Sequence, residues 1–317
     1  MKKFILKLFF FLSIFVLLYV SLNSYAKIAV KNKSVYKLSD SIKILVLGHS
    51  QPECAINDTK INSIKNLSQG GESYFYTYFK LKKIIEENVN VNKVILSFSN
   101  NQVKKEMDNW TYGENYMPNF YSKYNFLMQQ DDINVLIKNN FKTFIYSENK
   151  AFISNLKLLS SSNKNIFENR NWGGYLPLKR NKVDSLLKIK YLKKLKLNSQ
   201  NKISNINLIY LDSIIKYCKN KHVNLYLIRL PIQKDYFKID NEVQFQKIRT
   251  SNYRTIPYLD FHNFPLKNNE FGDFDHLNSN GALKFSIFLN TLFKNGLLIN
   301  ENPQKVIDNE IDKLKEY

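Results

Sequence analysis

A serine near the start of the chain and an aspartate–histidine pair near its end are residue types that enzymes use for acyl transfer. Ser50 follows an apolar run and Gly48, in the sequence Ile42-Lys43-Ile44-Leu45-Val46-Leu47-Gly48-His49-Ser50. Asp273 lies three residues before His276. A carboxylate at this spacing can accept the Nδ1 proton of the imidazole and leave Nε2 free as a base. Together the three side chains could activate a hydroxyl as a nucleophile.

The neighbouring residues predict the elements that would position this chemistry. The apolar run before Gly48 predicts a buried parallel strand, and the glycine permits a tight turn at its end. Ser50 would then lie at the carboxyl end of a strand, where open α/β sheets bind ligands. The aspartate–histidine pair is expected on a loop before a helix, with Ser279 as N-cap and Gly296 after its end. A polar turn without chemistry explains the serine segment alone equally well, so the two segments together carry the prediction.

The rest of the chain alternates between strand and helix patterns. This alternation is typical of an α/β fold with a parallel sheet, in which strand–helix–strand connections are right-handed. We expect helices over 73–88 and 205–220 and from Pro303 onward, and strands over 93–98, 223–230 and 256–261.

Four segments resemble the sequence blocks of the SGNH/GDSL hydrolases. They are Gly48-His49-Ser50, Asn66-Leu67-Ser68-Gln69-Gly70-Gly71, Val94-Ile95-Leu96-Ser97-Phe98-Ser99-Asn100-Asn101 and Asp273-x-x-His276. His49 stands where the usual signature has Asp, and Phe98 stands where the third block has its leading glycine. The overall plan is most similar to the membrane-anchored, DltD-like members, which are associated with cell-envelope polymers.

The resemblance implies a flavodoxin-like three-layer parallel sheet of the SGNH hydrolase type. It implies that Ser50 is the nucleophile, that His276 is the base and that Asp273 orients the base. Asp275 is the competitor for this last role. The family's second and third blocks supply an oxyanion hole, whose candidate donors here are the amides of Ser50 and of Gly70 or Gly71, and the side chain of Asn100 or Asn101.

The first 26 residues predict a signal anchor or a signal peptide. Three lysines precede an apolar stretch between Leu8 and Leu22. This order directs the following chain across a membrane. Cleavage after Ala26 would release the protein, whereas an uncleaved stretch would anchor it. In both cases residues 27–317, the predicted SGNH-like α/β domain, would work on the extracytoplasmic side, periplasmic or outer.

Residues 104–200 interrupt the alternation and predict a helical, aromatic-rich insertion. Its rings could cap a carbohydrate site or pack on the sheet, and packing is preferred because aromatic side chains commonly dominate core burial. Arg170, Lys179 and Arg180 are candidate anchors for an anionic substrate group. The aromatic positions are Trp110, Tyr112, Tyr116, Phe120, Tyr121, Tyr124, Phe126, Trp172 and Tyr175.

The formal charge of +20 constrains the partners. In a cytosolic protein it would suggest nucleic acid, but in an exported chain it favours anionic lipid surfaces or acidic glycans, so no nucleic acid partner is predicted. The lysine-rich run 188–196 predicts a solvated helix face, with membrane-surface contact as the other option. Cys54 and Cys218 have no metal-ligand spacing and could form a disulfide or stay as two buried thiols. No metal and no cofactor are predicted.

The sequence therefore predicts a serine-dependent acyl ester hydrolase or O-acyltransferase that acts on a cell-envelope polysaccharide or related glycan. The acylated glycan, or another ester, would form an acyl-serine intermediate. Attack by water would make the protein an esterase, and attack by a sugar hydroxyl would make it a transferase. The alternative is a catalytically silent SGNH-like domain that binds envelope glycan or an acyltransferase partner, which the altered third block favours. A cationic membrane-surface scaffold is the third hypothesis.

Overall fold

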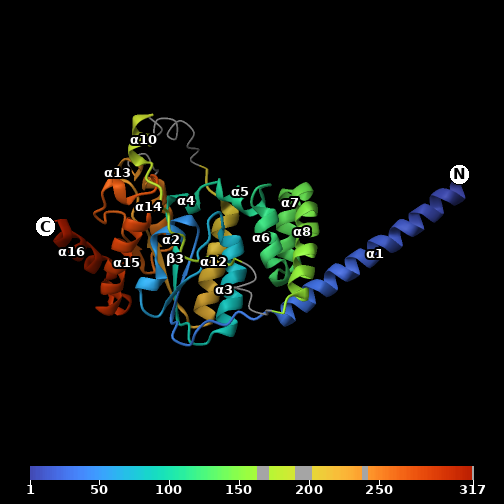
Figure 1. The fold of residues 1–317 in the computed structure, drawn as a ribbon, viewed down its shortest axis with the longest axis horizontal. Helices are drawn as coiled ribbons and strands as arrows, with labels where there is room; N and C mark the ends of the chain where they lie inside the picture. The colour runs from blue at the N-terminus through green and yellow to red at the C-terminus, as the bar shows by residue number, and fades with distance from the viewer. Residues whose placement is uncertain (163–170, 190–201, 238–241, 316–317) are drawn as a thin grey trace. The chain divides into compact units, whose positions relative to one another are not determined.

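The computed structural model describes residues 1–317 apart from 163–170, 190–201, 238–241 and 316–317 (Figure 1). The chain forms two compact units. Residues 38–111 and 172–317 form the sheet unit, which contains all the strands of the described residues. Residues 1–37 and 112–171 form the helical unit.

The sheet has five strands that pair in parallel in the order β2-β1-β3-β4-β5. This is the flavodoxin-like order of doubly wound folds, so the predicted fold class is confirmed. Leu47 pairs with Leu96, and Ser97 pairs with Ile228, so the carboxyl ends of three strands meet at one edge. The strands are β1 (Ile44–Leu47), β2 (Ile64–Asn66), β3 (Lys93–Ser97), β4 (Asn224–Arg229) and β5 (Tyr258–Asp260).

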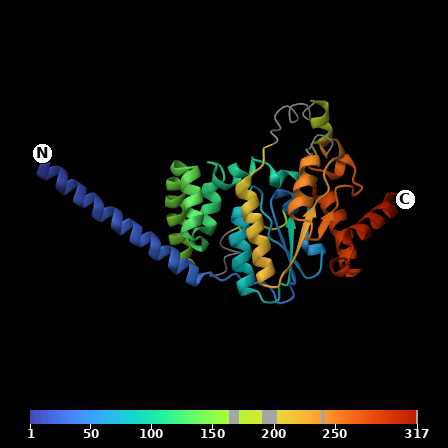
Figure 2. The same ribbon diagram turned by 180° about the vertical axis from the view of Figure 1, so that it is seen from behind.

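Helices cover both faces of the sheet, which gives three layers (Figures 1 and 2). α3 packs against α12 on one face, and α2 packs against α15 on the other. Every residue of β1 is buried, because a strand covered on both faces is a continuous apolar run and does not alternate. The helices are α2 (Ser50–Ala55), α3 (Tyr74–Glu87), α4 (Asn100–Val103), α5 (Met107–Tyr112), α10 (Val183–Lys188), α12 (Asn205–Asn220), α13 (Lys234–Phe237), α14 (Glu242–Asn252), α15 (Ser279–Lys294) and α16 (Pro303–Lys315), with 3-10 turns η1 (Asp58–Lys60), η3 (Asn268–Glu270) and η4 (Leu297–Ile299).

The expected elements agree with the observed ones to within a few residues, but the prediction of Ser279 as N-cap is wrong. Asn278 caps α15, and its Oδ1 accepts hydrogen bonds from the amides of Asn280 and Gly281. Ser279 is the first helical residue, and its hydroxyl donates to the Leu178 carbonyl. Asn and Ser are about equally good N-caps, so their order alone could not separate them.

The helical unit contains α1 (Lys2–Lys33), α6 (Met117–Tyr124), the 3-10 turn η2 (Asn125–Leu127), α7 (Gln130–Asn139) and α8 (Phe141–Ser160). α1 is long and apolar enough to cross a membrane. Phe120, Tyr121, Tyr124 and Phe126 are buried, and Tyr121 packs edge-on against Phe144 of α8 within the helical unit. These rings therefore serve core packing, whereas packing on the sheet stays a prediction. Arg170 and residues 190–196 of the lysine-rich run lie outside the described residues.

The two cysteines are separate, buried thiols, so the disulfide alternative is wrong. Burial raises the pKa of Cys54 and of Cys218 to about 12. Both thiols are therefore protonated and unreactive at neutral pH.

Candidate active site

Ser50 is the first residue of α2 and follows the carboxyl end of β1. Between them, Gly48 has a φ of +144°, and a Cβ atom there would lie 2.6 Å from the Cβ of Ser97. Only glycine fits where the ends of β1 and β3 approach so closely. The serine hydroxyl is thereby held at the ligand-binding edge of the sheet.

The side chains of Ser50, His276 and Asp273 form one hydrogen-bonded chain. His276 Nε2 lies 2.7 Å from Ser50 Oγ, and His276 Nδ1 lies 2.8 Å from Asp273 Oδ1. The same carboxylate oxygen accepts hydrogen bonds from the amides of Asp275 and His276, each at 3.0 Å. Two segments from opposite ends of the chain therefore meet in the arrangement of a nucleophile, a base and an orienting carboxylate.

The carboxylate and the imidazole stabilise each other's charged forms. Burial alone would raise the pKa of Asp273, but the hydrogen bond and charge of His276 hold this pKa well below its usual range. Burial alone would lower the pKa of His276, but the hydrogen bond to Asp273 and the charge of Asp275 raise this pKa above its ordinary value. Asp273 thus stays ionised wherever His276 titrates, and it can stabilise the protonated ring.

Asp275, the competitor for the orienting role, has other partners. Its Oδ1 accepts a hydrogen bond from Gln51 Nε2 at 2.5 Å, and its Oδ2 accepts one from Asn101 Nδ2 at 3.0 Å. These bonds tie the aspartate–histidine loop to α2 and α4. The geometry therefore gives the orienting position to Asp273 and a bridging position to Asp275.

His49 caps α2 where the family signature has an aspartate. Its Nδ1 accepts a hydrogen bond from the amide of Gln51 at 3.3 Å and lies 3.4 Å from Ser50 Oγ. Complete burial and the charge of His276 lower the pKa of His49 to about 3. The ring is therefore neutral at physiological pH, and it supplies the acceptor that an N-cap requires.

The candidate donors of the oxyanion hole differ in whether they already have a hydrogen-bond partner. The amide of Gly70 already donates to Glu53 Oε2 at 2.9 Å, and the Asn101 side chain is held by Asp275. The Asn100 side chain is 3 % exposed, and neither its nitrogen nor its oxygen has a hydrogen-bond partner within the described part of the chain. Buried amides are nearly always paired, so an unpaired one at this edge of the sheet is available to a bound group.

Arg180, a candidate substrate anchor, pairs instead with Asp273 Oδ2. Its hydrogen bond helps to keep Asp273 ionised, and its charge lowers the pKa of His276. The segment that carries Arg180 is held beside the second block, because the amide of Gly174 donates to the Ser68 carbonyl at 3.0 Å. Lys179 is exposed. No local pattern shows which carboxylate an arginine will reach, so sequence reasoning found the residue but not its contact.

Three charged residues that support the second block were missed in the sequence. Lys80 and Glu72 are fully buried and form an ion pair at 2.8 Å, and Lys80 Nζ also donates to the Leu67 carbonyl at 2.7 Å. Glu53, whose pKa is raised by burial, holds the Gly70 amide. The available signal was a lysine on the apolar face of the predicted helix 73–88, where charge is unexpected.

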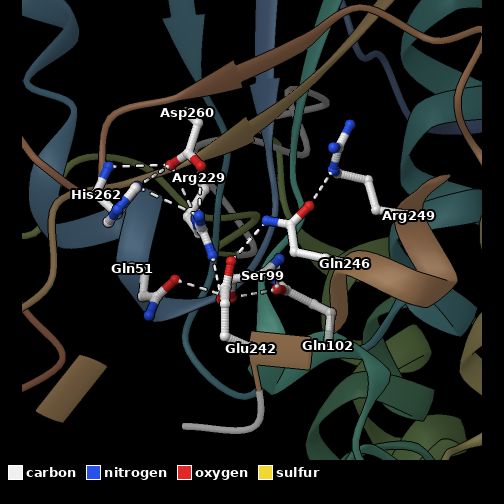
Figure 3. A network of polar contacts seen from close by, with 9 residues as sticks. All are labelled: Gln51, Ser99, Gln102, Arg229, Glu242, Gln246, Arg249, Asp260 and His262. Atoms are coloured by element: carbon white, nitrogen blue, oxygen red, sulfur yellow. Dashed lines mark hydrogen bonds and ion pairs between the residues drawn. The ribbon is translucent and has the colours of Figure 1, made fainter. Parts of the chain in front are cut away.

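A second aspartate–histidine pair lies at the carboxyl end of β5 (Figure 3). His262 Nδ1 is 2.8 Å from Asp260 Oδ1, and Arg229 donates to the same oxygen at 2.9 Å. Arg229 is 2 % exposed and also donates to Glu242 at 2.7 Å. These hydrogen bonds and ion pairs connect the ends of β4 and β5 to the start of α14. The same view shows Ser99 between Gln51 and Gln102, a polar link from α2 to α4 (Figure 3).

Comparisons with known proteins give distant likenesses. One protein-family model, which has no descriptive name, matches residues 176–298, less than half of the chain. No curated protein matches the sequence. A presumed acylhydrolase from Bacteroides fragilis is 10 % identical with a TM-score of 0.31, and the match covers 82 % of this chain and 91 % of that one. A GDSL-like lipase from Bacteroides thetaiotaomicron is 9 % identical with a TM-score of 0.31, and the match covers 86 % and 99 %. TM-scores this low carry no argument about fold, family or activity.

Proposed function

We propose that this protein is a serine-dependent acyl ester hydrolase or O-acyltransferase of the SGNH/GDSL type. The observation that carries the proposal is the hydrogen-bonded chain from Ser50 to His276 to Asp273, with heavy-atom distances of 2.7 Å and 2.8 Å. Both distances are within the reach that proton transfer from a nucleophile requires.

In the proposed reaction, Ser50 Oγ attacks the ester carbonyl carbon while His276 Nε2 accepts its proton. The negative charge that develops on the carbonyl oxygen would be met by the amides of Ser50 and Gly71 and by the side chain of Asn100. Gly71 is preferred to Gly70 because the Gly70 amide is already engaged by Glu53. The tetrahedral intermediate then expels the alcohol, which takes the proton from His276. An acyl-serine remains, and water or a sugar hydroxyl releases it.

The proposed substrate is an acyl ester on a cell-envelope polysaccharide or related glycan. α1 supports membrane anchorage near such a polymer, because it is long and apolar enough to span a bilayer and its apolar stretch follows Lys2, Lys3 and Lys7. The proposed location of the sheet unit is the extracytoplasmic side. The strongly basic composition supports an acidic polymer or an anionic surface as the neighbour.

A fluorophosphonate probe and an acetyl ester test the proposal on the full-length protein in detergent. The wild type should be labelled at Ser50, located by peptide mass spectrometry, and should hydrolyse the ester. Ser50→Ala should lose both properties, whereas Ser160→Ala, which changes an exposed serine on α8, should keep them. A folded wild type that is neither labelled nor active would refute the enzyme and leave the silent glycan-binding domain. Adding a glycan acceptor to the labelled acetyl ester then separates the transferase, which yields acetylated glycan, from the esterase.

A further inference from the structure

We infer that the N-terminal end of α8 lies in the headgroup layer of the membrane that α1 crosses. The helical unit would then hold the membrane through a second contact besides the anchor. This inference rests on the proposed membrane anchorage and uses contacts within the helical unit alone.

α1 is divided into an exposed part and a packed part. Large apolar side chains from Phe4 to Leu22 are exposed. Further along, Asn23, Ala26 and Val30 are 5 %, 1 % and 0 % exposed. Lys27 forms an ion pair with Glu148 of α8 at 2.5 Å. From Asn23 onward the helix is therefore packed into the helical unit, whereas the large apolar side chains before Asn23 are exposed and can lie in the bilayer.

This division bears on cleavage of the leader. The candidate cleavage site after Ala26 lies inside the packed part of α1, within a continuous helix. Proteolysis concentrates at exposed, poorly ordered segments, which this position is not. Cleavage there would also separate Asn23 from the α8 residue Glu148, to which its side chain donates at 3.1 Å. The structure thus favours a retained anchor.

The contacts of α1 also fix the direction of α8. The Tyr19 hydroxyl donates to Asn149 at 2.7 Å, and the Tyr19 ring packs edge-on against Phe152 with centroids 5.5 Å apart. At the end of α1, Lys33 donates to the carbonyls of Leu159 and Ser161 at 2.6 Å and 3.1 Å. From Tyr19 to Lys33 the two helices therefore run in the same overall direction, although the side chains of Asn23 and Lys27 reach back to Glu148. The N-terminal end of α8 must lie on the side of the apolar stretch.

The level of the contact follows from helix geometry. Tyr19 lies three positions before Leu22, the end of the apolar stretch, which at a rise of 1.5 Å per residue is about 5 Å inside it. Tyrosine is enriched at this depth, where amphipathic helices also bury their apolar faces. Asn149 and Phe152, which touch Tyr19, are thereby at the level of the interface, and the start of α8 continues from them toward the bilayer.

The exposed side chains at the start of α8 suit that environment. Phe141, Ile145 and Tyr146 are 62 %, 46 % and 63 % exposed. Exposed Lys142 lies among them, and exposed Lys138 precedes them. Aromatic and aliphatic side chains interspersed with lysines are the composition of interfacial helices, which bind anionic lipids. One bilayer can therefore cover these residues and the apolar stretch of α1 together.

Site-specific labelling of the full-length protein in vesicles of phosphatidylglycerol and phosphatidylcholine tests the inference. Single cysteines replace Ile145 at the start of α8, Phe9 in the apolar stretch and exposed Ser160 at the end of α8, and each carries an environment-sensitive fluorophore. The buried thiols of Cys54 and Cys218 should not react under native conditions. Lipids with a quencher near the headgroup report contact at position 145, and lipids with a quencher deep in the acyl chain report insertion at position 9.

Quenching at positions 145 and 9, without quenching at 160, is the expected result. Quenching at position 9 without quenching at positions 145 and 160 would overturn the inference about α8 but would support the membrane anchor. No quenching at position 9, or a mature N-terminus at Lys27, would remove the anchorage and overturn the inference with it. The proposed chemistry is judged separately, because fluorophosphonate labelling of Ser50 does not depend on the membrane. That labelling also verifies that each variant is folded.

Discussion

Replacing Asp273 with asparagine should cost far more activity than the same change at Asp275, although both carboxylates raise the pKa of His276. Asp273 accepts the hydrogen bond from His276 Nδ1 at 2.8 Å. An asparagine there can present its NH2 group to Nδ1, which would shift the ring proton to Nε2. A protonated Nε2 cannot accept the proton of Ser50, so the base is lost.

The expected magnitude follows from the role of the carboxylate. We expect Asp273→Asn to lower kcat by about 10³- to 10⁴-fold, the loss typical of a wrong tautomer in this arrangement. This loss corresponds to about 4 to 5 kcal/mol of transition-state stabilisation.

Asp275→Asn should have a different signature. The hydrogen bond between His276 and Asp273 survives, so kcat at the optimum pH should stay within about tenfold of the wild type. The negative charge that raises the pKa of His276 is lost, so this pKa falls. Because the neutral ring is the active form, the acidic limb of the kcat/KM profile should move to lower pH. Either Gln51 or Asn101 would lose its acceptor, at a cost of about 1 to 3 kcal/mol in unfolding free energy.

The assay is the pH dependence of acetyl ester hydrolysis by the full-length protein in detergent, with the fraction of active sites titrated by the fluorophosphonate probe. Thermal unfolding of each variant separates loss of fold from loss of chemistry. Equal damage from both substitutions at unchanged thermal stability would refute the assignment of Asp273 as the orienting residue.

Three further substitutions probe the surroundings of the site. Arg180→Ala removes a charge that lowers the pKa of His276, so the acidic limb of the kcat/KM profile should move to higher pH, and an unchanged or opposite shift would contradict this. Asn100→Ala should lower kcat by about 10²- to 10³-fold with little change in KM, as for other oxyanion donors. An unchanged kcat in steady-state kinetics would contradict a role of Asn100 in the oxyanion hole. Lys80→Met leaves the charge of Glu72 buried with the Thr77 hydroxyl but without its cation, so urea unfolding should show a loss of about 3 to 5 kcal/mol in unfolding free energy. A loss below about 1 kcal/mol would show that the ion pair is dispensable.

The sheet and its connections could be predicted because their signals are local. β1 lies in a continuous apolar run that ends at Gly48, and α12 has the boundaries predicted for it, 205–220. The parallel order of the strands follows from such alternation. The N-cap of α15 was misplaced by one residue because two good capping residues are adjacent there.

The site was only partly accessible to sequence reasoning. The spacing of Asp273 and His276 predicts that a carboxylate on the same loop can reach the ring, but it left Asp275 as a competitor until the structure showed the partners of both. Arg180, Glu53 and Lys80 contact residues outside their own turn of helix or loop. Their neighbours in the sequence do not indicate which residue each one will contact. The packing of α1 on α8 belongs to the same class, because an apolar leader gives no sign of which helix its end will contact.

Asp275 has a consequence for how this site can diverge. Its two oxygens bind the side chains of Gln51 and Asn101, the residues next to Ser50 and Asn100. One carboxylate thus couples the aspartate–histidine loop to the starts of α2 and α4, and a shift in any of these three segments would disturb the other two. If the proposed chemistry holds, relatives that accept different acyl groups should keep these segments fixed and vary ones that the carboxylate does not bind, such as the chain from 174 to 179.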